Sequence, residues 1–305
     1  MKNTAESAER FKNTRKSKNS NKMTKAEDGR SIGIQGRVRE VLARGAPNFV
    51  REYAIEKEWQ ESLARLKEKL PELRRVKNRL PRTVLIIPDG GRRFAKEHGI
   101  SDERAYNLGA RLLYEGLMQF DEFSEVKNII LWAWSTDNEI KRPREQKEAV
   151  FKTMAKCLAD YRDELVERNA RVTRVGRIDR LTLPLARELG RAELATGENS
   201  GTNIILAIDY GEDYEDSLFA QEVARSNLNE WAITPELAVR LREQARSIPV
   251  PDLVIRTSGE LHLSKFPYSN HAELVVVDTN LPATMPDVFA DALLSYTNRD
   301  IRGGR

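Results

Sequence analysis

Cysteine is nearly absent from this sequence. One cysteine stands among 305 residues, and a lone cysteine forms no disulfide within its own chain. Met154, Cys157, Leu158 and Tyr161 recur at helical spacing, so we interpret Cys157 as a small core residue rather than a nucleophile. The sequence therefore predicts a protein of a reducing compartment, the cytoplasm, without a disulfide framework.

Long apolar runs are also absent. No stretch of about 18 apolar residues occurs, so we expect no membrane-spanning helix. No apolar core follows the first lysines, so we expect no secretory signal peptide. Residues 1–30 contain few apolar side chains, and we predict that they form a disordered basic tail. This tail is either a solvated segment or a tether to anionic lipid, which would make the protein peripheral to a membrane.

Excess charge of one sign is small. The net charge is +4, and residues 1–30 hold nine Lys or Arg against four Asp or Glu. Since much of the positive excess lies in the predicted tail, we expect no nucleic-acid partner.

A helical pattern follows the tail. Residues 31–80 are predicted to form an N-terminal helical extension, in which Pro71 should end or kink the helix. One face of this helix carries apolar residues at helical spacing: Phe49, Tyr53, Ile55, Trp59, Leu63, Leu66 and Leu70.

Residues 81–305 alternate between strand and helix patterns. Strands are predicted over residues 83–87, 126–134, 171–175, 202–208, 252–255 and 274–277. Helices are predicted over residues 104–120, 144–169, 183–196, 214–227 and 235–245. This alternation predicts an α/β fold with a mostly parallel six-stranded sheet flanked by helices. Ligands of such folds bind at the carboxyl ends of the strands.

The first motif follows the first predicted strand. Residues 87–95 read I-P-D-G-G-R-R-F-A, with Asp89 placed before two glycines and two arginines. Glycines let backbone N–H groups approach an anion, and arginines and a helix N-terminus attract one. Asp89 suits such a place if it binds Mg²⁺ that a diphosphate also ligates. An ordinary β-turn before a helix is the alternative interpretation.

Three more segments flank predicted strands. Residues 132–143 read W-A-W-S-T-D-N-E-I-K-R-P, which indicates either ligand-binding polar groups or a helix-capping turn. Residues 255–265 read I-R-T-S-G-E-L-H-L-S-K, either a second anion site or a surface loop. Glu273 leads into an apolar strand, where a carboxylate is rare unless it is paired or metal-bound.

These segments resemble, in order and spacing, the motifs of the cis-prenyltransferases, the undecaprenyl diphosphate synthase family. The family's M-D-G-N-G-R-W-A motif is similar to residues 88–95, and its F-S-x-E-N and R-P motifs are similar to residues 134–143. Its D-L-x-I-R-T-[SG]-G-E-x-R-x-S-N-F motif is similar to residues 252–266, and its A-E-L motif to residues 272–274. The resemblance covers the chain from about Pro81 onward, which predicts a catalytic domain over residues 81–305.

The resemblance implies a homodimer or heterodimer with a hydrophobic tunnel for a growing isoprenoid chain. It implies catalytic roles for Asp89, Asn138 and Glu273, with Mg²⁺ bound by Asp89 and Glu273. It also implies that the substrate diphosphates bind Gly90, Gly91, Arg92, Arg93, Arg142, Arg256, His262 and Ser264.

Several positions depart from the family pattern. Gly91 replaces an asparagine, and His262 replaces a diphosphate-binding arginine. The arginine and histidine of the family's next loop correspond to Asp102 and Tyr106. A histidine reaches less far than an arginine, so these departures predict a weakened or altered site for the homoallylic diphosphate.

The resemblance favours condensation of an allylic diphosphate with isopentenyl diphosphate to a cis-polyprenyl diphosphate. Two alternatives stay open. One is altered prenyl chemistry, either a branching coupling or a cyclisation of allylic diphosphates. The other is a catalytically weak partner subunit of another prenyltransferase, against which the retained Asp89, Arg256 and Glu273 argue.

Overall fold

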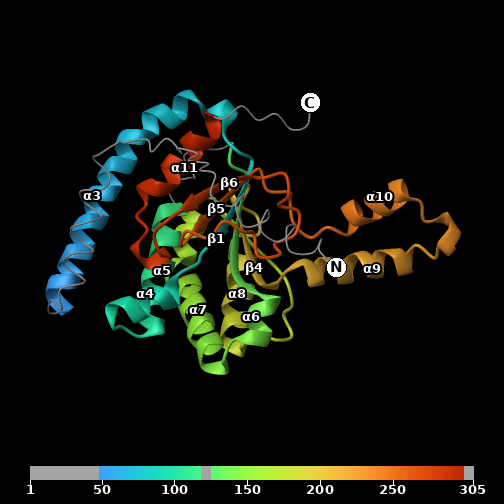
Figure 1. Ribbon diagram of the computed structural model, residues 1–305, viewed down its shortest axis with the longest axis horizontal. Coiled ribbons are helices and arrows are strands. Elements are labelled where there is room, and N and C mark those ends of the chain that lie inside the picture. Colours follow the sequence, from blue (N-terminus) through green and yellow to red (C-terminus); the bar gives the residue numbers. More distant parts are fainter. Residues whose placement is uncertain (1–47, 118–124, 299–305) are drawn as a thin grey trace, which may run out of the picture. The chain divides into compact units, whose positions relative to one another are not determined.

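A computed structural model of the chain describes residues 48–117 and 125–298 (Figure 1). These residues belong to one compact unit, Val41–Arg305. The predicted basic tail, residues 1–30, and the start of the predicted helical extension lie outside the described residues.

Six parallel strands form one sheet, in the order β3-β4-β2-β1-β5-β6, which confirms the predicted α/β fold. The strands are β1 Thr83–Ile87, β2 Asn128–Ser135, β3 Arg171–Val175, β4 Asn203–Tyr210, β5 Leu253–Thr257 and β6 Glu273–Val277. Strands β2, β4 and β5 run one or two residues further than predicted. The pairing between strands thus continues into their polar carboxyl ends, where Ser135 of β2 pairs with Tyr210 of β4.

Helices connect the strands. They are α3 Asn48–Arg75, α4 Gly91–His98, α5 Asp102–Leu117, α6 Thr136–Lys141, α7 Arg144–Glu167, α8 Leu183–Ala195, α9 Glu212–Arg225, α10 Pro235–Ala245 and α11 Asp287–Thr297. Short 3₁₀ turns lie at η1 Lys77–Arg79, η3 Glu230–Ala232 and η4 Leu281–Ala283. Helices α6 and α11 were not predicted from the sequence. Helix α6 is a short turn capped by the Ser135 hydroxyl.

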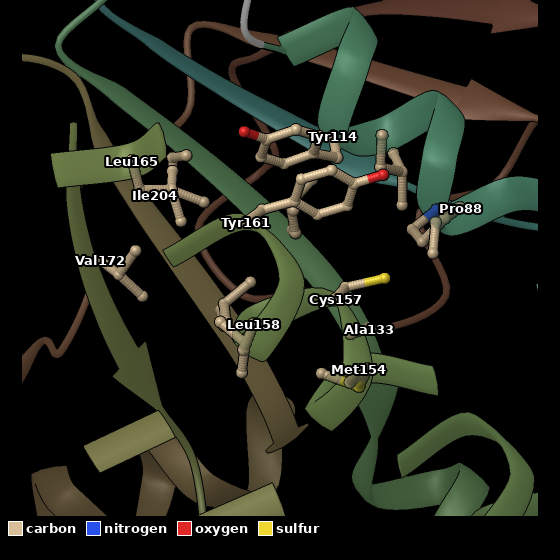
Figure 2. Close-up of a pocket in the computed structure, with 14 residues that line it drawn as sticks. Pro88, Tyr114, Ala133, Met154, Cys157, Leu158, Tyr161, Leu165, Val172 and Ile204 are labelled. Atoms are coloured by element: carbon tan, nitrogen blue, oxygen red, sulfur yellow. The ribbon is translucent and has the colours of Figure 1, made fainter. Parts of the chain in front are cut away.

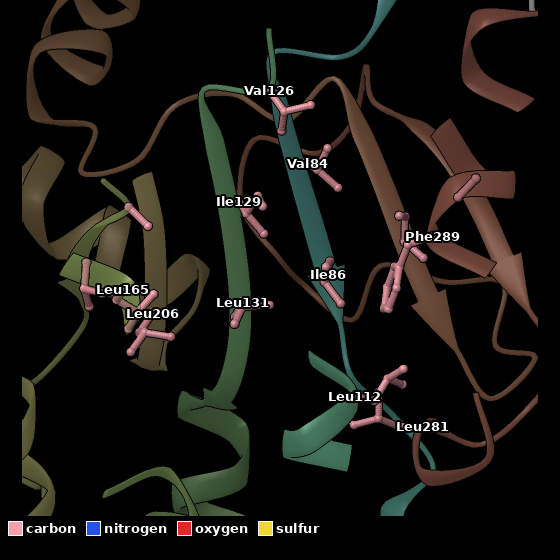
Figure 3. Close-up of a cluster of buried hydrophobic side chains, with 14 of the residues drawn as sticks. Val84, Ile86, Leu112, Val126, Ile129, Leu131, Leu165, Leu206, Leu281 and Phe289 are labelled. Atoms are coloured by element: carbon pink, nitrogen blue, oxygen red, sulfur yellow. The ribbon is translucent and has the colours of Figure 1, made fainter. Parts of the chain in front are cut away.

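Alternate strand residues face two apolar clusters because successive side chains of a strand point to opposite faces. The larger cluster contains Val84 and Ile86 of β1, together with Leu112 of α5 and Phe289 of α11 (Figure 3). Helices α3, α7 and α8 contribute to it as well. The smaller cluster, on the other face, joins strand residues to side chains such as Phe266.

Helix α3 continues through Pro71 to Arg75, so Pro71 does not end it. Leu70 and Leu73, on either side of the proline, are buried in the larger cluster. Their packing offsets the hydrogen bond that a proline removes from a helix. In Figure 1 the helix curves over this last part, as a proline inside a helix leads one to expect.

Helices α9 and α10 pack against each other and extend away from the sheet (Figure 1). Among the residues that the structure describes, no helix is both long and apolar enough to cross a bilayer.

Candidate active site

The loops that carry the first three motifs meet at one edge of the sheet. Strands β1, β2 and β5 are parallel neighbours, so the segments that follow them lie side by side. A cavity of about 370 Å³ opens between them. Its lining includes six of the predicted site residues: Asp89, Gly91, Asn138, Arg142, Arg256 and Ser264.

Asp89 is held by backbone and side-chain donors. Its Oδ1 accepts from the Gly90 N–H at 2.7 Å, and its Oδ2 accepts from Arg256 Nη2 at 3.0 Å. The Thr257 hydroxyl accepts from the Asp89 N–H and donates to the Asp89 carbonyl, both at 2.8 Å. Thr257 was not among the predicted site residues, although its hydroxyl directly follows Arg256 in the sequence. The Asp89 side chain stays 35% exposed, so it remains accessible from the cavity.

Gly90 must be a glycine for two reasons. Its φ is +95°, which side chains rarely adopt, and a Cβ there would lie 2.3 Å from Asn280 Oδ1. Gly90 precedes helix α4, whose first N–H groups have no acceptor within the helix. Gly91, the first residue of α4, lines the cavity. The helix N-terminus therefore offers backbone donors and partial positive charge to an anion in the cavity.

Arg256 joins the first motif to the third. It is buried, and its Nη1 donates to Ser264 Oγ at 2.9 Å and to the His262 carbonyl. His262 Nδ1 lies 2.9 Å from the same Ser264 hydroxyl. Ser264 has a positive φ of 49°, and the loop that carries it turns back over Arg256. The structure thus brings Arg256, His262 and Ser264 together.

Arg142 brings a second positive charge to the cavity. Its guanidinium lies 5.2 Å from the centre of the Trp134 ring. Burial and the charge of Arg92 both lower the pKa of Arg142. An anion bound near Arg142 and Arg92 would relieve this repulsion. Tyr106 also lines the cavity, and burial raises its pKa, although the adjacent Arg142 opposes this.

Two predicted site residues lie elsewhere. Arg93 Nη2 pairs with Glu260 at 2.9 Å, so this side chain binds the loop after β5 instead of lining the cavity. Glu273 starts β6 beside Leu253, which pairs with Val84 near the start of β1.

The predicted metal pair of Asp89 and Glu273 is therefore not formed within one chain. Glu273 begins its strand and Asp89 follows one, so parallel pairing places them at opposite edges of the sheet. The five residues from Val84 to Asp89 correspond to about 16 Å along a strand. The order and spacing of the motifs in the sequence do not show how far apart these two carboxylates lie in the fold.

An apolar chamber of about 130 Å³ continues from the cavity (Figure 2). The two share wall residues, among them Pro88, Ala133 and Met154. Helices α5 and α7 form its sides over strands β2, β3 and β4. Cys157 lines it, and burial raises the pKa of this thiol to about 11, which makes it a poor nucleophile at neutral pH.

Comparison with known proteins agrees with this geometry. The family model Prenyltransf, which describes undecaprenyl diphosphate synthases, matches residues 87–304. An isoprenyl transferase of Chlamydia caviae is 31% identical over 238 residues, which cover 74% of this chain and 93% of that protein. A tritrans,polycis-undecaprenyl-diphosphate synthase (geranylgeranyl-diphosphate specific) of Methanopyrus kandleri is 32% identical over 247 residues, covering 78% of this chain and 90% of that protein.

A solved structure shares the fold. Lavandulyl diphosphate synthase from Lavandula x intermedia, in complex with dimethylallyl diphosphate, superposes with a TM-score of 0.67 and is 25% identical. The match covers 75% of this chain and 100% of that one. The chain belongs to the undecaprenyl diphosphate synthase family and is a prenyltransferase of isoprenoid biosynthesis.

Proposed function

We propose that this protein condenses an allylic diphosphate with isopentenyl diphosphate and forms a cis-prenyl diphosphate chain. The observation that supports this reaction is the continuity of two cavities of opposite character. Arginines and a helix N-terminus surround the polar cavity, and the adjoining chamber is apolar. A diphosphate head and a prenyl tail need these two environments side by side.

The polar cavity offers two diphosphate sites. The allylic diphosphate binds the backbone of Gly90 and Gly91 with Arg92 and Arg142. The diphosphate of isopentenyl diphosphate binds Arg256, Ser264 and His262. Asn138 also lines the cavity and positions the reacting ends.

Charge stabilisation and positioning carry the reaction. The N–H and arginine donors stabilise the departing diphosphate as the allylic C–O bond breaks. The double bond of isopentenyl diphosphate then forms the new C–C bond, and a proton is lost to restore a double bond. The apolar walls exclude water from the allylic cation.

A divalent metal, which we take to be Mg²⁺, fits this site through Asp89. Asp89 is a partly exposed carboxylate in the arginine-rich cavity, and Mg²⁺ commonly binds one carboxylate together with substrate phosphates. When bound, the metal offsets negative charge on the leaving diphosphate. Among the described residues no group of three or more His, Cys, Asp or Glu side chains forms a metal site, so the phosphates would supply other ligands.

A second candidate function is altered prenyl chemistry, a branching coupling or a cyclisation of allylic diphosphates. His262 stands at the isopentenyl diphosphate site, and the solved lavandulyl diphosphate synthase shares the fold. A catalytically weak partner subunit is less well supported, because Asp89, Arg256 and Ser264 retain one connected cluster.

We also propose that the protein is a dimer. The arm of α9 and α10 extends from the sheet and carries Trp231, whose side chain is 86% exposed. Tryptophan is enriched at protein–protein interfaces, so we place the contact between the two subunits at this arm.

One experiment distinguishes the candidates. The purified protein is incubated with Mg²⁺, labelled isopentenyl diphosphate and each C5 to C20 allylic diphosphate in turn, and product masses are measured. Elongation adds isopentenyl units to the allylic primer. Branched or cyclic products without isopentenyl diphosphate support the second function. Full occupancy of the site without any product would contradict both reactions and support the partner subunit.

A further inference from the structure

The hydroxyl of Tyr106 is a buried donor without an acceptor. Tyr106 belongs to α5, and its side chain lines the polar cavity that Asp89 and Arg142 also line. Its hydroxyl oxygen is buried, and no atom of the described residues forms a hydrogen bond with it. An unpaired polar group is costly inside a folded protein, so a group of this kind in the wall of a cavity indicates a ligand that pairs with it.

The surroundings of this hydroxyl select an anion. Burial raises the pKa of Tyr106, so the phenol stays protonated at neutral pH and can donate a hydrogen bond. The charges of Arg142 and Arg92 oppose this rise in pKa and that of Asp102 adds to it, which places two cations and one carboxylate around the phenol. A negatively charged acceptor, such as a phosphate oxygen, is therefore favoured here over a neutral one.

The ring of Tyr106 lies against Gly91 at the start of α4. A Cβ at position 91 would lie 3.1 Å from Tyr106 Cε1 and 3.3 Å from its Cδ1, so even an alanine there needs the ring to shift. Gly91 is not among the glycines with a positive φ, so its backbone conformation does not require a glycine. The requirement comes from the ring, which occupies the place that a side chain at position 91 would take.

Gly91 and Tyr106 both depart from the family's motifs, and the structure shows that the two departures meet. Gly91 stands in place of an asparagine, and Tyr106 in place of a histidine. Because the tyrosine ring fills the space beside Gly91, the two replacements form one coupled change. The cavity loses a polar side chain from α4 and gains a hydroxyl from α5.

We propose that the Tyr106 hydroxyl donates a hydrogen bond to the diphosphate of the allylic substrate, and that its ring requires a glycine at position 91. The inference rests on the proposed prenyl transfer and names a further residue of its allylic site. The N-terminus of α4 and the phenol of α5 contact the same anion, which fixes its position between the two helices.

Binding without turnover tests the hydroxyl. A C10 allylic thiolodiphosphate, whose bridging sulfur slows ionisation, is titrated by calorimetry into the protein with Mg²⁺. Tyr106→Phe keeps the ring and should raise the dissociation constant about tenfold, as expected for one hydrogen bond to a charged group. Tyr296→Phe removes a phenol hydroxyl of α11 that lines neither cavity, and should leave the dissociation constant unchanged. An unchanged dissociation constant in Tyr106→Phe would overturn the proposal.

Steady-state kinetics distinguishes this contact from a general loss of structure. In Tyr106→Phe the Michaelis constant for the allylic diphosphate should rise about tenfold, while that for isopentenyl diphosphate and the thermal unfolding curve stay close to wild type. A rise for isopentenyl diphosphate alone would place the hydroxyl at the other diphosphate and overturn the assignment. If the analogue binds as expected but no product forms, the proposed reaction fails and the Tyr106 contact is retained.

A double-mutant cycle tests the contact between Tyr106 and Gly91. Gly91→Asn should weaken binding of the analogue at least about tenfold, because the larger side chain displaces the Tyr106 ring. In Tyr106→Ala the same substitution should cost no more than about twofold, since the ring is already absent. Gly190→Asn, at a glycine of α8 with open space beside it, is the control. Equal costs of Gly91→Asn in both backgrounds would overturn the part assigned to Gly91. Should Tyr106→Ala fail to fold, Tyr106→Leu replaces it.

Discussion

At the scale of single residues, Arg256 connects the parts of the candidate site. Its guanidinium reaches Asp89 in the first motif and Ser264 in the third, although these residues are far apart in sequence. A buried arginine with donors pointing in two directions fixes both loops. The positions of Asp89 and Ser264 are therefore coupled, and a change at one should affect the other.

We predict that Asp89→Ala lowers kcat by at least about a hundredfold, because it removes the proposed metal ligand and an Arg256 partner. Asp137→Asn is the matched control, since Asp137 lines the same cavity but pairs with Lys141. Steady-state kinetics at saturating Mg²⁺ and a thermal unfolding curve check both variants. A kcat within about tenfold of wild type would exclude this role for Asp89.

We predict that His262→Arg lowers the Michaelis constant for isopentenyl diphosphate by about tenfold, which corresponds to one charge-assisted contact. The histidine already touches Ser264, so a longer and permanently charged side chain there should reach the same diphosphate. His271→Arg adds the same charge at an exposed position and is the control. If instead the site accepts a second allylic diphosphate, His262→Arg should harm that native reaction and leave isopentenyl diphosphate use poor.

At the scale of elements, the docking of α3 depends on a buried carboxylate. Asp287 of α11 accepts from Ser62 Oγ at 2.6 Å and from Arg65 Nε at 2.7 Å, both on α3. Burial alone would raise the pKa of Asp287, but the bonds from Arg65 and Ser62 outweigh it and hold the pKa below its usual value. The ionised carboxylate therefore stabilises the contact between α3 and α11.

We predict that Asp287→Asn lowers the free energy of unfolding by about 2 kcal/mol at neutral pH. Because the folded state depresses this pKa, the stabilisation is present above the unfolded value, about 3.9, and is lost as pH falls below it. The difference between wild type and variant should therefore shrink below about pH 4 in urea titrations. Asp291→Asn removes an exposed carboxylate of the same helix, paired with Lys69, and should cost much less. An equal loss for both variants would contradict the role of burial.

The bounds of the helices and strands show where local sequence signals were enough to predict an element and where they were not. The pattern of residues 83–87 and 171–175 predicted β1 and β3 with their observed bounds, because each is a short strand between turn signals. The continuation of α3 through Pro71 was decided by Leu70 and Leu73, which pack in the core. Tertiary packing thus outweighed the helix-breaking tendency of Pro71, as it outweighs other local secondary-structure propensities.

At the scale of the whole molecule, we predict that residues 1–30 are dispensable for catalysis in solution. They contain few apolar residues, and the buried core of the described chain begins at Trp59. A protein that starts at Ser31 should keep kcat/KM within about twofold and its free energy of unfolding. A protein that starts at Pro81 also lacks α3 and should unfold far more easily, since Leu66, Leu70 and Leu73 are lost. Loss of most activity from the first truncation would show that the tail acts in catalysis.

The sequence by itself determined the type of fold and the edge of the sheet at which the charged residues of three motifs gather. Strands alternating with helices predict a parallel sheet, and parallel strands place their following loops at one edge. That rule was enough to bring Asp89, Arg142 and Arg256 to one cavity before any contact was known. These conclusions depend on the local alternation of strand and helix patterns and on the direction of the strands, both of which can be inferred from a sequence.

Only the tertiary structure decided which residues meet across elements. Glu273 begins its strand and therefore lies at the edge away from Asp89, although the family resemblance implied a shared metal. The stack of Tyr114 and Tyr161 and the contact of Trp59 with Glu115 join helices whose facing sides no local pattern specifies. The physical reason is that helix–helix register and side-chain contact follow from packing of the complete core, to which residues distant in sequence contribute together.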